Sequence, residues 1–199
     1  MGGNSVGKTS NAALVHDFFK RNLGGERKVY EWIDQGKKCS FTKMNLASSN
    51  LGVFGRTACG GTDTLNSKFQ IQKSFEKALS VSDVVIIEGI MATGTWIEFI
   101  KRPGVYLWLV LLDVSEENNF QRLKQRRSVK RNVSPEEIII SAKTQENLAG
   151  KLRGFRSLFE RMRPYADKAT FLDTNSLNQE QVGGKVREEL ISIISNTTF

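Results

Sequence analysis

The first ten residues have the spacing of a phosphate-binding loop, because Gly2–Thr9 fits the pattern G-x-x-x-x-G-K-[ST]. Glycines let such a loop turn tightly, so that successive backbone N–H groups point at one anion, and the following helix directs its positive end there. We expect Lys8 to reach the β- and γ-phosphates of a nucleotide, and the Thr9 hydroxyl to bind Mg²⁺. The residues predicted to hold the nucleotide are Gly2, Asn4, Ser5, Val6, Gly7, Lys8, Thr9 and Ser10.

The sequence around this loop matches one part of the strand–loop–helix context in which such loops occur. An amphipathic helix is predicted directly after the loop, over residues 8–22. A buried strand normally precedes the loop, but only Met1 stands before Gly2, so we expect the first strand of the fold to be missing or truncated. The alternative is that the glycines only cap a helix.

A second segment, Gly55–Leu65, places an arginine, paired glycines and an aspartate between a predicted strand and a predicted helix. Ligands of open α/β sheets bind at the carboxyl ends of the strands, where this segment is expected to lie. Arg56 can bind a phosphate, and Gly60 and Gly61 allow a substrate to approach the backbone closely. Asp63 can accept a hydroxyl proton or hold a metal-bound water. The alternative is that Asp63 only caps the next helix.

A third candidate is Glu88, at the end of the near-continuous apolar run Val84–Ile90. Such a run predicts a parallel strand that is buried on both faces. A carboxylate at its end is costly unless a cation meets it. In phosphate-loop proteins an acid at this position faces the Mg²⁺ ion, so Glu88 is predicted to organise the metal with Thr9. The alternative is a carboxylate exposed at the edge of the sheet.

The third quarter of the chain is strongly basic. A strand is predicted over 104–112, followed by a helix with Ser115 as its N-cap and acids in its first turn. The helix then carries basic residues from Arg122 to Arg131. Arginines in this place suit a lid, around residues 122–134, that neutralises a migrating phosphoryl group through Arg126, Arg127 and Arg131. The alternative is a solvated helix face.

The remaining pattern predicts one α/β domain over residues 1–199, with a mostly parallel sheet. Further strands are expected over 28–33, 39–45, 51–55 and 169–173, the first two as a hairpin-like insertion. Further helices are expected over 65–81, 92–101, 134–148 and 152–165, and from an N-cap at Ser176 onward.

Composition restricts the class of protein. The 199 residues are 39% hydrophobic and 25% charged, as in an ordinary globular protein, and no apolar run is long enough to span a membrane. Two cysteines make no disulfide framework, and no signal-peptide pattern is seen, so we expect a cytoplasmic protein, in a host cell if the gene is a phage's. The net charge of +8 predicts attraction to nucleotides, nucleic acid or both.

The glycine loop, the strand that ends in Glu88-Gly89 and the segment from Asp113 to Arg127 resemble the nucleoside and nucleotide kinases of the phosphate-loop superfamily. The Gly55–Thr64 segment also resembles bacteriophage kinases, among them the 5-hydroxymethyluracil DNA kinases. This resemblance implies a three-layer α/β fold, ATP and Mg²⁺ as cofactors, and transfer of the γ-phosphoryl group. The implied acceptor is a hydroxyl or a phosphate of a nucleotide or of DNA, with the hydroxymethyl group of 5-hydroxymethyluracil as one candidate.

Motifs and resemblance together assign the expected roles. Lys8, Asp63, Arg126 and Arg127 are predicted to be catalytic, and Thr9 and Glu88 to bind the metal. The substrate is expected at Arg56, Gly60, Gly61, Asp63 and Glu88. Alternatives are a kinase of small nucleosides or nucleoside monophosphates, an NTPase that is no kinase, and a nucleic-acid-binding protein with a degenerate nucleotide site.

Overall fold

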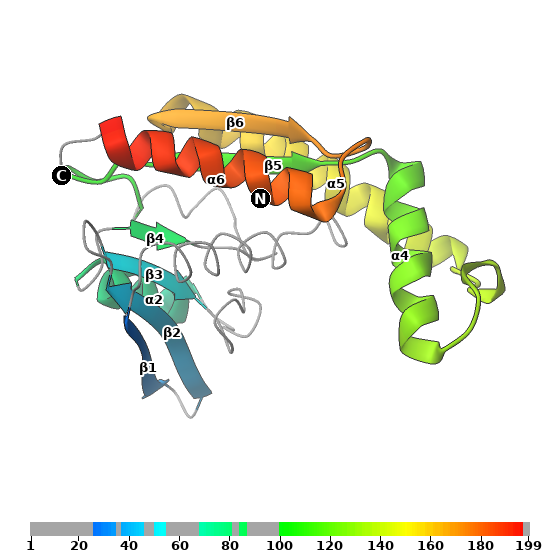
Figure 1. Cartoon of the computed structure of the whole chain (residues 1–199), viewed down its shortest axis with the longest axis horizontal. Helices are drawn as coiled ribbons and strands as arrows, with labels where there is room; N and C mark the ends of the chain where they lie inside the picture. The colour runs from blue at the N-terminus through cyan, green and yellow to red at the C-terminus, as the bar shows by residue number, and fades with distance from the viewer. Residues whose placement is uncertain are drawn as a thin grey trace. The chain divides into compact units, whose positions relative to one another are not determined.

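The computed structural model describes residues 26–34, 37–45, 50–54, 68–80, 84–86 and 100–196 (Figure 1). These residues divide into two compact units. One contains residues 100–178, and the other contains the described residues between 26 and 86 together with 179–196. Helices and strands are both present, so the predicted α/β class is confirmed. No helix in the described ranges is long and apolar enough to cross a membrane.

The second unit contains a four-stranded sheet in the order β1-β2-β3-β4. Strands β1 (Glu26–Asp34) and β2 (Lys37–Asn45) pair antiparallel, which confirms the predicted hairpin. Strand β3 (Asn50–Phe54) pairs antiparallel with β2 and parallel with β4 (Val84–Ile86). Only the first part of the strand predicted over 84–90 is among the described residues.

Two helices also belong to this unit. Helix α2 (Lys68–Leu79) contacts β2 and β4, and it buries Phe75 and Ala78, three residues apart, as a helix with one apolar face should. Helix α6 (Gln179–Asn196) buries Val182, Leu190 and Ile193.

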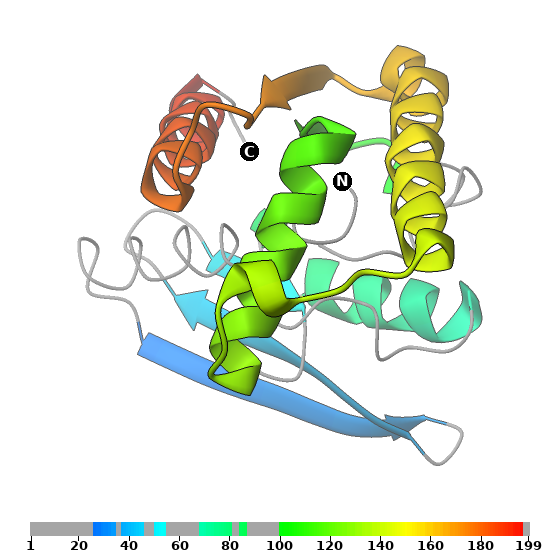
Figure 2. The same ribbon diagram turned by 90° about the vertical axis from the view of Figure 1, so that its right-hand side faces the viewer.

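The first unit is built on two parallel strands, β5 (Trp108–Asp113) and β6 (Lys168–Asp173), paired from Trp108↔Lys168 to Asp113↔Asp173. Helix α4 (Glu116–Arg131) follows β5, and helix α5 (Ala142–Met162) follows α4 through the 3₁₀ turn η3 (Pro135–Glu137) (Figure 2). A second 3₁₀ turn, η4 (Arg163–Tyr165), leads from α5 into β6.

Helix α5 contacts β5 through one apolar stripe. Its buried residues recur every three or four positions, as the helical period requires. They are Leu148, Ala149, Leu152, Phe155, Leu158, Phe159 and Met162. Burying a large apolar side chain contributes about 1.5–3 kcal/mol, so this stripe is the main attachment of α5.

Several predicted helix boundaries are wrong. A capping box forms at Ser134, since the Ser134 N–H donates to Glu137 Oε1 at 2.9 Å, and hydrogen bonds from Ser134 lower the pKa of Glu137. It opens only η3, however, and the predicted helices 134–148 and 152–165 are replaced by this turn and by continuous α5. Helix α6 begins at Gln179 rather than after Ser176.

The amino ends of β5 and β6 are held together by Asp167. Its carboxylate accepts from Lys101 Nζ at 2.6 and 2.7 Å and from the Leu107 N–H at 2.7 Å. Partial burial of the carboxyl raises its pKa, but the hydrogen bonds from Lys101 and Leu107, with the lysine charge, outweigh burial and lower the pKa of Asp167.

We expect Asp167→Asn to lower the melting temperature at pH 7. A carboxyl whose pKa is lower in the folded state stabilises the fold above its unfolded pKa, near 4, and this contribution is lost as the pH falls through the folded pKa. The melting temperatures of variant and wild type should therefore converge as the pH falls below about 4. A difference that stays constant over this range would contradict the argument.

Candidate functional site at the carboxyl ends of β5 and β6

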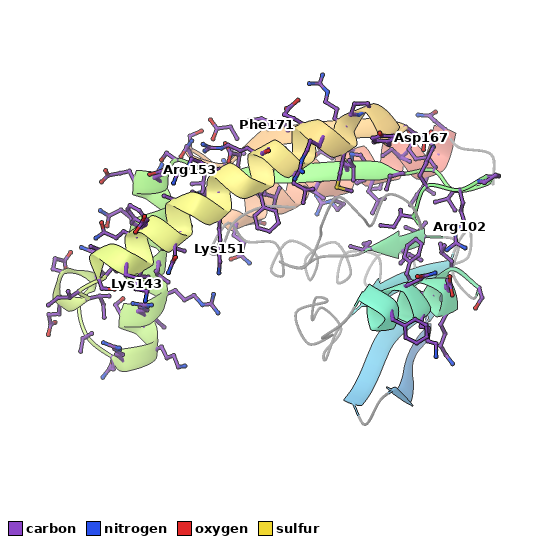
Figure 3. All side chains as sticks on the ribbon, turned by 180° about the vertical axis from the view of Figure 1, so that it is seen from behind. Arg102, Lys143, Lys151, Arg153, Asp167 and Phe171 are labelled. Atoms are coloured by element: carbon purple, nitrogen blue, oxygen red, sulfur yellow. The ribbon has the colours of Figure 1, made fainter. Side chains whose placement is uncertain are left out.

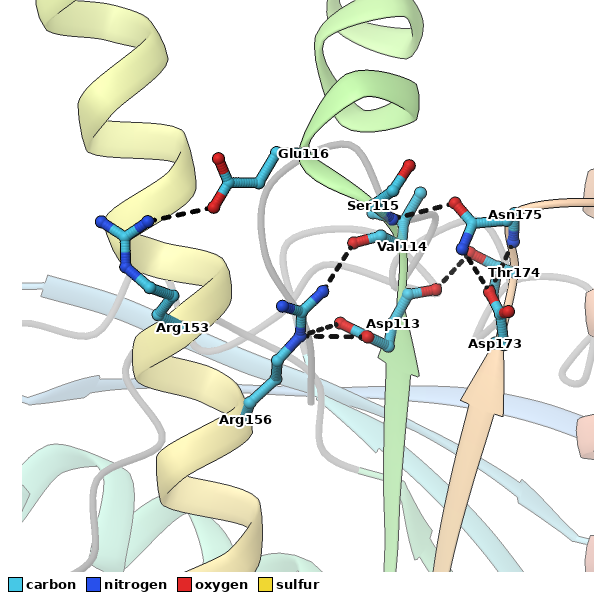
Figure 4. A network of polar contacts seen from close by, with 9 residues as sticks. All are labelled: Asp113, Val114, Ser115, Glu116, Arg153, Arg156, Asp173, Thr174 and Asn175. Carbon is cyan, nitrogen blue, oxygen red and sulfur yellow. Dashed lines mark hydrogen bonds and ion pairs between the residues drawn. The ribbon is translucent and has the colours of Figure 1, made fainter.

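Polar residues gather where β5 and β6 end, the edge at which open parallel sheets bind ligands. Each strand ends in an aspartate, and Asp113 and Asp173 are partners in the strand register. Two carboxylates this close repel each other unless each is compensated. The two compensating groups come from different parts of the unit (Figure 4).

Asp113 is compensated by Arg156 of α5. Arg156 Nε donates to both carboxylate oxygens, at 2.9 and 3.0 Å, and Nη2 donates to the Val114 carbonyl at 3.0 Å. The Asp113 side chain is 13% exposed, whereas that of Arg156 is 40% exposed. Asp113 is thus committed to an ion pair that joins β5 to α5, and it is a structural group rather than an available general base.

Asp173 is compensated by local hydrogen bonds. Its Oδ1 accepts from the backbone N–H of Asn175 at 2.9 Å and from Asn175 Nδ2 at 2.7 Å. Asn175 Oδ1 in turn accepts from the Ser115 N–H and from Asn118 Nδ2, both at 2.9 Å. The end of β6 is thereby tied to the first turn of α4.

Thr174 is completely buried between the strand ends. Its hydroxyl donates to the Asp113 carbonyl at 2.7 Å and accepts from Arg122 Nη1 at 3.0 Å, while Arg122 Nη2 donates to the Thr174 carbonyl. Arg122 belongs to the basic run, yet these bonds commit it to holding α4 against β6.

The start of α4 is fixed as the sequence predicts. Ser115 is the N-cap, its hydroxyl accepts from the Asn118 N–H at 3.2 Å, and Glu116 and Glu117 lie in the first turn. Asn132 is the C-cap of the helix, and its φ of 55° gives the left-handed conformation common after helices. Arg126 and Arg127 lie further along α4, beyond its first turn. Arg126 is exposed and Arg127 is half-buried.

Asn119 of α4 is fully buried, and neither side-chain polar atom has a hydrogen-bond partner within the described part of the chain. Burying such a group without a partner costs about 1–3 kcal/mol. Asn119→Leu keeps the branching and the number of side-chain heavy atoms and removes this cost. We therefore expect the variant to be more stable than wild type by about 1 kcal/mol in urea unfolding. Asn119→Ala, which also removes volume, is the control, and a loss of stability in the leucine variant would contradict the argument.

Most predicted site residues lie outside the described residues. They are Gly2, Asn4, Ser5, Val6, Gly7, Lys8, Thr9, Ser10, Arg56, Gly60, Gly61, Asp63 and Glu88. Only Arg126, Arg127 and Arg131 can be placed, all on α4. The described residues contain no group of three or more His, Cys, Asp or Glu side chains that could hold a metal ion.

Comparison of the chain with protein-family models, with curated proteins and with solved structures gives no match. The function of the chain must therefore be inferred from its sequence motifs and from the described geometry.

Proposed function

We propose that the chain is an ATP-dependent kinase that transfers the γ-phosphoryl group to a hydroxyl of a nucleotide-type acceptor. The observation that carries this proposal is the spacing of Gly2–Thr9, since its glycines, lysine and threonine suit phosphates and Mg²⁺. The strand β5, followed at its carboxyl end by a helix rich in arginine, supports it.

In the proposed mechanism, the glycine-rich loop neutralises and holds the phosphates of ATP. Lys8 neutralises the β- and γ-oxygens, and the backbone N–H groups of the loop hold them in place. Thr9 and Glu88 are the proposed Mg²⁺ ligands, because hydroxyl and carboxylate oxygens are the donors that this hard cation prefers. The ion would neutralise charge that develops on the transferred group.

The acceptor is proposed to bind along the Gly55–Leu65 segment. Arg56 positions it, and Asp63 orients the attacking hydroxyl and takes its proton. Arg126 and Arg127 cover the phosphates from α4 and stabilise the transferring group. Such a reaction is accelerated mostly by positioning and charge stabilisation. In support, Arg122 already fixes the base of α4, so that the two arginines extend from a braced helix.

The acceptor itself has two candidates. The net charge of +8 favours a hydroxyl carried by DNA, such as that of 5-hydroxymethyluracil, over a small molecule. The second candidate acceptor is a nucleoside or nucleoside monophosphate, since kinases of these small molecules also have basic lids.

The proposal is tested by transfer of ³²P from γ-labelled ATP to a panel of nucleosides, nucleotides, plain DNA and DNA that contains 5-hydroxymethyluracil. Label only in the modified DNA would identify a DNA base kinase, and label only in a nucleotide would identify a metabolic kinase. Hydrolysis of ATP without transfer to any acceptor would instead favour a switch-like NTPase. DNA binding with no ATP binding would favour a nucleic-acid-binding protein and overturn the kinase proposal.

A further inference from the structure

We propose that α4 is a docking surface for the phosphate backbone of double-stranded DNA. The surface consists of Lys124, Arg126, Arg127, Lys130 and Arg131, here called the α4 basic surface. No aspartate or glutamate occurs between residues 118 and 135, so nothing along this stretch of chain offsets the charge.

Several other basic residues of the first unit are paired with acids, whereas these five cations have no partner within the described ranges. Arg153 and Arg156 of α5 are paired with Glu116 and Asp113, and Lys101 is paired with Asp167. Within the described ranges, no side chain of the α4 basic surface forms an ion pair or a hydrogen bond. Arg126, Lys130 and Arg131 are exposed, and Lys124 and Arg127 are half-buried.

The arrangement is unfavourable for the isolated helix. Like charges three or four residues apart, as in Arg126 with Lys130 and Arg127 with Arg131, destabilise a helix by about 0.2–0.5 kcal/mol per pair. The helix dipole favours cations in the last turn, which accounts for Lys130 and Arg131. It does not account for Lys124, Arg126 and Arg127. A polyanion outside the chain would relieve the repulsion, and its attraction explains the concentration of charge.

The side chains between these cations favour a duplex over other polyanions. A helix that binds an acidic membrane needs a broad apolar face, whereas Val129 is the one large apolar side chain that α4 exposes. Proteins that bind single strands stack bases on exposed aromatic rings, but the sole aromatic residue of α4, Phe120, is half-buried. Contact by charge alone suits the regularly spaced phosphates of a duplex.

This inference does not require phosphoryl transfer. Lys124 and Lys130 contribute to the α4 basic surface, but they are not among the arginines proposed to cover the phosphates of ATP. Replacing these two lysines by neutral residues therefore tests DNA binding separately from phosphoryl transfer. Lys151 of α5 and Lys185 of α6 are likewise lysines within helices, without a partner in the described part of the chain, and they provide the matched control (Figure 3 labels Lys151).

The test measures binding of a fluorescein-labelled DNA duplex by anisotropy, without ATP, in the full chain and two double variants. For Lys124→Gln/Lys130→Gln, we expect the slope of log K against log salt to become shallower by about 2, and affinity at low salt to fall roughly tenfold, since each phosphate contact contributes about 0.9 to the slope. Lys151→Gln/Lys185→Gln should keep a slope and an affinity close to those of the wild type. Thermal melting of both variants checks that they fold.

Equal slopes for the two double variants would overturn the inference, as would the absence of binding to DNA. Binding to phosphatidylserine vesicles that depends on Lys124 and Lys130, without binding to the duplex, would overturn it in favour of a membrane surface. If the chain transfers phosphate but its affinity for DNA does not depend on α4, the kinase proposal stands and the DNA-docking inference is overturned. The two failures are thus distinguishable.

Discussion

Lys8→Ala is expected to abolish phosphoryl transfer from ATP. The lysine ammonium is the proposed partner of the β- and γ-oxygens, where negative charge accumulates as the phosphoryl group leaves. Removing one such pre-positioned donor typically lowers turnover by about 10²–10³-fold, and here the lost group also carries a full charge. The measurement is the initial rate of label transfer from γ-³²P-ATP at saturating acceptor.

The matched control is Lys151→Ala, which removes an exposed lysine of α5. This variant should transfer label at the wild-type rate, because Lys151 lies in no proposed site. Circular dichroism of both variants excludes unfolding as the cause of a loss. Near-normal turnover in Lys8→Ala would contradict both the phosphate-loop assignment and the kinase proposal.

Local signals in the sequence predict several elements of the described fold. The β-branched and aromatic residues within 28–33 predict a strand of the hairpin, and the antiparallel pairing of β1 with β2 confirms the hairpin. The N-cap at Ser115 is confirmed because a serine before a helix satisfies a free N–H with its own hydroxyl, whatever surrounds it. Signals of this kind require no knowledge of tertiary contacts.

The helix boundaries around α5 were predicted wrongly because several local signals compete there. Ile138 and Ile140 are buried and Ile139 is exposed, an alternation that suits extended chain and ends the helical turn of η3. Ser141 is a second N-cap, accepting from the Thr144 N–H at 3.3 Å, and it starts α5. Gly150 and Gly154 do not break α5, since the buried stripe on its other face outweighs about 1 kcal/mol per glycine.

Most of the strand-edge network could not be predicted, because its partners are distant in sequence. Arg156 binds Asp113 from 43 positions away, and Arg122 binds Thr174 from 52 positions away. The sequence alone does not distinguish these two arginines from the other basic residues of the chain. Only tertiary structure separates these committed arginines from the unpaired ones of the α4 basic surface.

Arg156→Met is expected to destabilise the fold much more than Arg153→Met. Both arginines lie on α5, three residues apart, and both bind an acid of the β5–α4 segment. The Arg156 partner, Asp113, is only 13% exposed, whereas Glu116 is 44% exposed and Arg153 itself 61%. Methionine keeps most of the apolar stem, so the comparison isolates the charge and its hydrogen bonds.

Loss of Arg156 leaves the Asp113 carboxylate largely buried without its cation and frees the Val114 carbonyl. Hydrogen bonds to charged groups contribute about 1.5–3 kcal/mol, and the partial exposure of Arg156 reduces this through solvent screening, so we expect a loss of about 1–2 kcal/mol. An exposed pair contributes roughly 0–1 kcal/mol, so Arg153→Met should lie at the low end of that range. Urea unfolding at pH 7 measures both losses. Equal losses would mean that burial of Asp113 does not control the strength of the pair, and that the edge of the sheet is not braced from α5.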